Sequence, residues 1–279
     1  MDTKTPAQEL HYASESISSQ LAAGVDSISE FAMRLADVMP SLISGFKGMV
    51  GIGKLDELKG LTSDQKTFVR LMGEHSYGEL RYIRGYAPEG FIGTFLQALD
   101  VLERSVAHCA TIDQRVLAPY TSFLANFTNG GQYIRSMNTD ELRNQKLKAD
   151  REELDKEYGS LFTNSKDARV QLGSLIERNG DWADVFRRAT NVHDAMQAVD
   201  RKNIAAQCRR AEVYLELIEK KIKDGKLKEA TPEVCKALAD GAEQVAHEVA
   251  YVSAVYYRVL EVFNSIDNTV SEVRRVIKA

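Results

Sequence analysis

The sequence contains few residues that break helices. Five of its 279 residues are proline, and none lies between Pro119 and Pro232. Because proline removes a backbone donor and clashes with the preceding helical turn, its absence leaves this interval free to form long helices. A β-sandwich would need turn residues about every 8–12 positions, and the second half of the chain lacks them. We therefore expect an all-α fold.

Cysteines, long apolar runs and an excess of one charge are also missing. Three widely spaced cysteines, Cys109, Cys208 and Cys235, predict free thiols in a reducing compartment. We expect no transmembrane helix and no signal peptide, because no run of about 18 apolar residues is present and the first residues are polar. The net charge is -4, and acids are interleaved with the basic residues between Asp200 and Glu229, so a nucleic-acid partner is not expected. Synthesis in the cytoplasm is the expected route.

Residues 1–62 are predicted to form an amphipathic and glycine-rich N-terminal region. A helix over residues 8–39, interrupted by Pro40, follows from the helical spacing of Ile17, Leu21, Val25, Ile28, Leu35 and Met39. Glycines, apolar residues and single lysines then alternate over residues 42–61. This composition suits a segment that contacts a partner protein or a membrane surface. It also suits a segment that packs tightly inside the protein. The candidate contact residues are Leu42, Ile43, Phe46, Lys47, Met49, Val50, Ile52 and Lys54.

A helical domain is predicted over residues 63–131. Thr62 and Gln65 have the spacing of a capping box, which predicts a helix from residue 63. A second helical stretch over residues 91–127 is expected to be interrupted or bent near Pro119. The sequence Thr128-Asn-Gly-Gly places a domain boundary after residue 131.

Residues 132–279 carry a sustained apolar period of 3.5 residues in three segments. The second segment runs from Trp182 to Leu217, and its apolar stripe includes Val213 and Leu217. Such a period keeps one stripe of each helix facing a partner helix. It predicts an elongated antiparallel bundle or coiled coil, a rod of three heptad-repeat helices. Pro232 fits the first position of the last helix, where its missing N–H is harmless. The candidate seam of that helix is Val245, Val249, Val252, Tyr256, Val259, Phe263, Ile266, Val270, Val273 and Ile277.

No motif assembles a catalytic, cofactor or metal site. Residues 48–54 have the glycine and lysine spacing of a phosphate-binding loop, but Leu55 stands where Mg²⁺ binding needs Ser or Thr. His247 and Glu248 begin a zincin-like motif, but position 251 is Tyr where the second His is required. We expect a non-enzymatic protein without cofactor, metal or small-molecule substrate.

Two functions fit this pattern best, ahead of an oligomeric chaperone or effector that would act through the rod. The first is a structural or assembly protein that associates with itself or with other proteins through helical interfaces, for example in a bacteriophage virion. The second follows from a resemblance: three long antiparallel heptad helices over about residues 91–279, behind an amphipathic segment, resemble a BAR-type module. The resemblance implies a peripheral protein that binds or shapes membranes.

Overall fold

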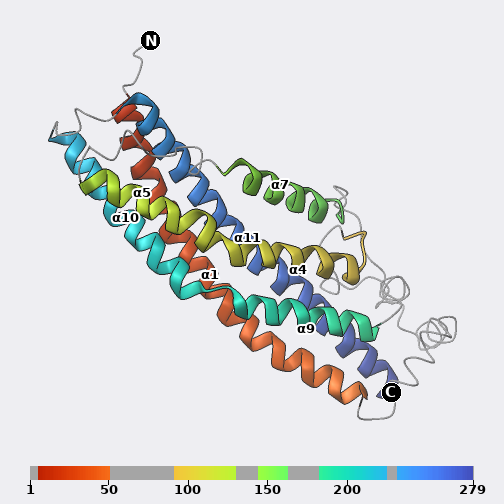
Figure 1. Cartoon of the computed structure of the whole chain (residues 1–279). Helices are drawn as coiled ribbons and strands as arrows, with labels where there is room; N and C mark the ends of the chain where they lie inside the picture. Colours follow the sequence, from red (N-terminus) through yellow and green to blue (C-terminus); the bar gives the residue numbers. More distant parts are fainter. Residues whose placement is uncertain (1–5, 51–90, 130–143, 163–181, 225–230, 279) are drawn as a thin grey trace. The chain divides into compact units, whose positions relative to one another are not determined.

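The computed structural model describes residues 6–50, 91–129, 144–162, 182–224 and 231–278, and most of them lie in helices (Figure 1). In chain order these are α1 (Pro6–Val50), α4 (Phe95–Ile112), the π-helical turn η1 (Asp113–Leu117), α5 (Ala118–Asn129), α7 (Gln145–Gly159), α9 (Trp182–Ala198), α10 (Arg201–Lys223) and α11 (Pro232–Lys278). Within these ranges the only β-pairing is one isolated bridge between Phe91 and Phe162. The all-α prediction is confirmed as a helical bundle, and coiled-coil geometry stays a prediction.

The first of two compact units, unit 1, combines the described parts of residues 1–30, 106–152 and 197–254. In this unit α4 and α5 run antiparallel to α11. The Tyr120 hydroxyl donates to the Leu238 carbonyl at 3.2 Å, while His108, earlier in the chain, lies 3.1 Å from Glu248, later in α11. Helix α10 packs on α5 and η1.

The second compact unit, unit 2, combines the described parts of residues 31–105, 153–196 and 255–279. Here α4 and α7 run antiparallel. The Gly93 N–H, before α4, donates to the Leu161 carbonyl, after α7, at 3.2 Å. Arg104, further along α4, meets Glu157 inside α7 at 2.5 Å.

Helices α1 and α11 run parallel to each other in unit 2. The rings of Phe31 and Tyr257 pack edge to face with centroids 5.5 Å apart. Further along both helices, Ser41 Oγ donates to Asp267 Oδ2 at 3.3 Å. The order of these contacts along the two helices fixes their relative direction.

Helix α1 continues through Pro40, so the predicted interruption at this residue is wrong. Proline in a helix interior costs about 3 kcal/mol relative to alanine. The neighbouring side chains Met39 and Leu42 are buried, and Ser41 bonds to α11. Tertiary packing on both sides of Pro40 therefore offsets its unfavourable effect on the helix.

Near Pro119, where the sequence predicts an interruption or bend, the structure has the π-helical turn η1 between α4 and α5. In this turn the Ala118 N–H donates to the Asp113 carbonyl, five residues back. Pro119 has no N–H to offer the Arg115 carbonyl four residues before it. The Asn144 side-chain amide donates to that carbonyl instead, at 3.4 Å. The same Asn144 caps α7, because its Oδ1 accepts from the Leu147 N–H at 3.2 Å.

The second heptad segment is two helices, not the single helix that the sequence predicts. Helix α9 ends at Ala198 and α10 begins at Arg201. Asp200 between them is an N-cap: its Oδ1 accepts from the Asn203 N–H at 2.9 Å, and its carbonyl accepts from the Ile204 N–H at 3.0 Å. The interruption changes the register of the buried stripe downstream.

The other helix starts follow capping chemistry. Thr94 and Gln97 form a capping box in which the Gln97 N–H donates to Thr94 Oγ1 at 3.1 Å and the Thr94 N–H donates to Gln97 Oε1 at 2.9 Å. Helix α4 therefore begins at Phe95 rather than at the predicted residue 91. The predicted start of α11 at Pro232 is confirmed, with Thr231 Oγ1 accepting from the Val234 N–H at 3.4 Å. The predicted domain boundaries after residues 62 and 131 lie outside the described residues, as does the Thr62 capping box.

Candidate functional site

The candidate contact segment begins inside the core of the bundle. Leu42 is 2% exposed, so its side chain is not available to a membrane or partner surface. Residues 43–50 belong to α1, and their side chains are not described; this group contains Ile43, Phe46, Lys47, Met49 and Val50. Ile52 and Lys54 lie outside the described residues. Contact by these seven residues stays a prediction.

The candidate seam on α11 is buried wherever its side chains are described. Val245, Val249, Val252, Tyr256, Val259, Phe263 and Ile266 are each at most 2% exposed. The side chains of Val270, Val273 and Ile277 are not described. Residues between the seam positions are buried too, among them Val255, Leu260 and Val262. Helix α11 is therefore buried around more of its circumference than a two-helix seam requires.

A buried charge cluster in unit 1 is centred on Glu248 of α11, which is 0% exposed. Glu248 Oε2 lies 3.1 Å from His108 Nε2 of α4, and Glu248 Oε1 lies 3.0 Å from Arg151 Nη1 of α7. The Arg151 contact is an ion pair without the alignment of a hydrogen bond. The ring of Tyr251 packs edge to face on His108 at 5.4 Å. One carboxylate thus joins side chains from three helices.

This cluster resembles a structural ion pair more than a reactive centre. A buried charge is costly unless it is paired, and Glu248 is paired on both oxygens. His247 and Glu248, which begin the incomplete zincin-like motif, lie in different environments: His247 is exposed, while Glu248 is buried in the core. Adjacent residues on a helix diverge by about 100°, so the two side chains cannot act together.

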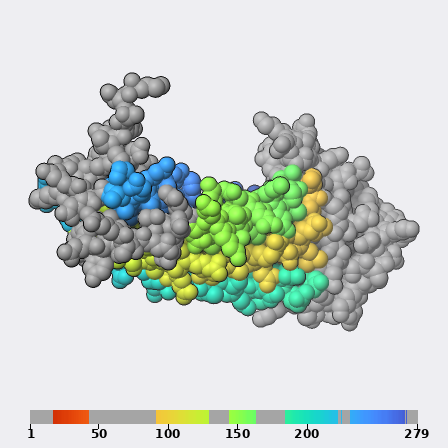
Figure 2. Space-filling model, turned by 45° about the horizontal axis from the view of Figure 1, so that its top comes forward, coloured from red at the N-terminus to blue at the C-terminus, as the bar shows by residue number. Residues whose placement is uncertain are grey.

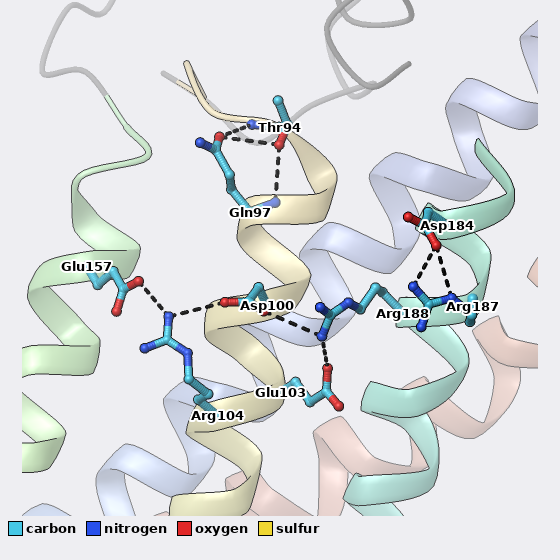
Figure 3. A network of polar contacts seen from close by, with 9 residues as sticks. All are labelled: Thr94, Gln97, Asp100, Glu103, Arg104, Glu157, Asp184, Arg187 and Arg188. Atoms are coloured by element: carbon cyan, nitrogen blue, oxygen red, sulfur yellow. Dashed lines mark hydrogen bonds and ion pairs between the residues drawn. The ribbon is translucent and has the colours of Figure 1, made fainter. Parts of the chain in front are cut away.

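A second polar network lies at the surface of unit 2, where α7, α4 and α9 are neighbours (Figures 2 and 3). Arg104 lies 3.4 Å from Asp100 and 2.5 Å from Glu157. Arg188 lies 2.6 Å from Glu103 and 3.4 Å from Asp100. Asp100 is shared by both arginines, so the network links the three helices through α4. The hydrogen bond from Arg104 lowers the pKa of Glu157.

An aromatic and cationic group packs where α7 ends in unit 2. The Tyr158 and Phe162 rings lie 5.1 Å apart, and Phe91 lies 5.6 Å from Phe162. The Arg258 guanidinium lies 4.8 Å from the centre of the Tyr158 ring and 2.6 Å from Asp155. Burial raises the pKa of the Tyr158 hydroxyl. This group is inter-helix packing rather than an exposed binding surface.

The cysteines have the environment of inert core residues. Cys109, Cys208 and Cys235 are buried, and none of the three forms a disulfide. Burial raises the pKa of Cys208 to about 12 and also raises that of Cys235, which disfavours the reactive thiolate. In the part of the chain that the structure describes, no group of three or more His, Cys, Asp or Glu side chains could hold a metal ion.

The outer face of α10 is the most distinctive exposed surface of unit 1. Buried positions of this helix follow a regular heptad spacing: Ile204, Cys208, Ala211, Leu215 and Ile218. Val213 and Leu217, which the sequence places in the buried stripe, are instead 54% and 44% exposed. They lie one helical turn apart, among the exposed charged residues Arg209, Arg210, Glu216 and Lys220.

Comparisons of the chain with protein-family models, with curated proteins and with solved structures found no match. No helix in the described ranges has the length and apolar character needed to cross a membrane.

Proposed function

We propose that this chain is a non-enzymatic structural or assembly protein that acts through helical interfaces, including interfaces with other copies of itself. The observation that carries the proposal is the outer face of α10, where Val213 and Leu217 expose adjacent apolar side chains. Large apolar side chains at helical spacing on an outer face are typical of helix-to-helix recognition.

The chemistry of the polar side chains supports the same proposal. Glu248 holds His108 and Arg151 in the core of unit 1, and Arg104 and Arg188 connect helices at the surface of unit 2. Each of these groups already has a structural partner. Their arrangement fixes the helices in position, as a structural or assembly protein requires.

Two helices of the bundle are long enough to span the distance between components of an assembly. α1 contains 45 residues and α11 contains 47. At 1.5 Å per residue each helix is about 70 Å long. A component of a larger particle, such as a virion, fits this combination of long helices and an exposed apolar face.

The mass of the full chain in solution tests the proposal. One copy has a mass of 31.1 kDa. We expect size-exclusion chromatography with light scattering to give a mass that rises above this value, to a dimer or larger multiple, as the concentration increases. A mass of one copy at every concentration would contradict self-assembly as the function.

A further inference from the structure

We infer that α7 is a detachable strap, which ion pairs hold on α4 and α11 and which leaves these helices while the rest of the bundle stays folded. Release of α7 is a conformational change within one copy of the chain. It therefore goes beyond the proposed function and does not depend on it.

Helix α7 offers few apolar side chains to the bundle. Four basic and five acidic residues make up nine of its 15 positions. Its buried stripe consists of Leu147, Arg151, Leu154 and Tyr158, so a charged residue occupies one of four buried positions. The opposite face is exposed and contains Lys146, Lys148, Ala149, Glu152, Glu153 and Lys156. Because local opening is easiest where few apolar contacts are buried, α7 is the helix that we expect to open first.

Two ion pairs at the surface of unit 2 attach α7 to its neighbours. Asp155 Oδ1 lies 2.6 Å from Arg258 Nη1 of α11, and Glu157 Oε1 lies 2.5 Å from Arg104 Nη2 of α4. The side chains of Asp155 and Glu157 are each 42% exposed. Salt screens ion pairs that are open to water, with a Debye length of about 10 Å at 0.1 M. This part of the attachment therefore weakens as the ionic strength rises.

The third ion pair lies in unit 1 and is buried. Arg151 Nη1 lies 3.0 Å from Glu248 Oε1 of α11. Removing two charges from water costs about as much free energy as their attraction contributes, so a buried ion pair adds little to the docking of a helix. His108 of α4 lies 3.1 Å from the second oxygen of Glu248 and remains beside it when Arg151 leaves. Release of α7 thus returns Arg151 to water and leaves Glu248 with a partner.

The chain just after α7 is held in a different way. The Leu161 carbonyl accepts from the Ile92 N–H at 2.8 Å and from the Gly93 N–H at 3.2 Å. The Phe162 ring packs against Phe91, with centroids 5.6 Å apart. These contacts involve no charged side chain, so salt does not screen them. A released α7 therefore stays tethered beside the start of α4 and can dock again in the same place.

Native-state hydrogen exchange of the full chain, followed by mass spectrometry in increasing urea, tests the inference. We expect the amides of residues 150–158 to exchange at least tenfold faster than the most protected amides of α11. Their exchange should also depend less on urea, because a local opening exposes less surface than unfolding of the whole bundle. Raising NaCl from about 0.05 M to about 0.5 M should speed the exchange of α7 by about threefold, since the surface pairs are screened.

A matched pair of variants tests the role of the ion pairs. Glu157→Gln removes the pair with Arg104 and should speed the exchange of α7 by about threefold. Glu153→Gln makes the same change of charge on the exposed face of α7 and is the control. The control should exchange like the wild type.

The possible outcomes separate this inference from the proposed function. Exchange of α7 at the rate and with the urea dependence of α11 overturns the inference, because α7 would then open only when the whole bundle unfolds. Fast exchange of α7 that responds neither to salt nor to Glu157→Gln overturns the attachment by ion pairs. The proposed function is tested separately, by the mass of the chain in solution.

Discussion

Glu248 shows how a single buried charge can hold several helices in unit 1. Its two oxygens meet His108 at 3.1 Å and Arg151 at 3.0 Å, and the side chain is 0% exposed. Removing one member of such a group leaves the others buried without a partner, and that loss exceeds the net value of the original pairing. We therefore expect this position to be more sensitive to substitution than the exposed positions of α11.

We expect Glu248→Gln to lower the free energy of unfolding by about 3 kcal/mol, because Arg151 keeps its charge and loses its counter-ion. Urea denaturation followed by circular dichroism measures this change. Glu243→Gln, at an exposed position of the same helix, is the control and should stay within about 0.5 kcal/mol of the wild type. Equal stabilities for the two variants would show that the cluster does not hold the core together.

Arg104 belongs to the polar network at the surface of unit 2, where it changes the pKa of a neighbouring carboxyl group. Its hydrogen bond to Glu157 lowers the pKa of that carboxyl. The ionised form is thus favoured in the folded protein, so the resulting stability is present above the pKa of the unfolded chain. It is lost as the pH falls through the lower pKa of the folded protein.

The substitution Arg104→Gln should raise the pKa of Glu157 towards its ordinary value, and carboxyl NMR titration measures this shift. Arg187→Gln is the control, since Arg187 pairs with Asp184 at 2.6 Å and not with Glu157. An unchanged pKa of Glu157 in Arg104→Gln would mean that the hydrogen bond does not persist in solution.

At the scale of elements, α1 and α11 approach each other closely at one glycine. A Cβ built on Gly24 would lie 2.6 Å from Val249 Cγ1 in unit 1, which is closer than any ordinary contact. Glycine within a helix normally costs about 1 kcal/mol relative to alanine. At this position the missing side chain instead allows the two helices to pack.

We therefore expect Gly24→Ala to destabilise the protein by about 1–3 kcal/mol, the usual cost of overpacking a core. Gly159→Ala provides the comparison: nothing lies within 4 Å of a Cβ at Gly159, so this variant should be neutral or slightly stabilised. Thermal unfolding of both variants is the measurement. A stabilised Gly24→Ala would contradict the close approach of α1 to α11.

Gly24 also shows a limit of predicting buried residues from the hydrophobic pattern of α1. The apolar period of α1 predicts Val25 on its inner face, but Gly24 is the buried residue and Val25 is only half-buried. A pattern based on hydrophobicity cannot recognise a position that must be small. Most of the stripe, including Leu21, Ile28 and Leu35, is buried as predicted.

Helix α10 shows a second limit of predicting buried residues from the hydrophobic pattern. The predicted stripe runs through Val213 and Leu217, whereas the buried stripe runs through Leu215 and Ile218. The sequence does contain a signal for this shift of the buried stripe, because Asp200 is a good N-cap residue and marks the start of a new helix. The Thr94 capping box, with Gln97 three residues later, is a similar signal that marks the start of α4. The buried cluster around Glu248 had no such signal, because its members come from segments far apart in the chain.

At the scale of the whole molecule, the fold consists of two compact units through which α1, α4, α7 and α11 all pass. We propose that the exposed helical faces of this bundle bind other proteins or other copies of the chain. At the surface of unit 2, Arg104 and Arg188 form ion pairs with acidic residues, and in unit 1 the outer face of α10 exposes the apolar side chains of Val213 and Leu217. Assembly through helical faces is thus the central claim.

Cross-linking between isotopically distinct copies tests this claim most directly. Equal amounts of ¹⁴N- and ¹⁵N-labelled full-length chain are mixed, treated with a lysine-reactive cross-linker and analysed by mass spectrometry. Copies that assemble bring lysines of one copy within reach of lysines of the other, so part of the cross-links should join a light peptide to a heavy one. Cross-links confined to peptides of a single isotope, at every lysine of the chain, would contradict assembly through helical interfaces.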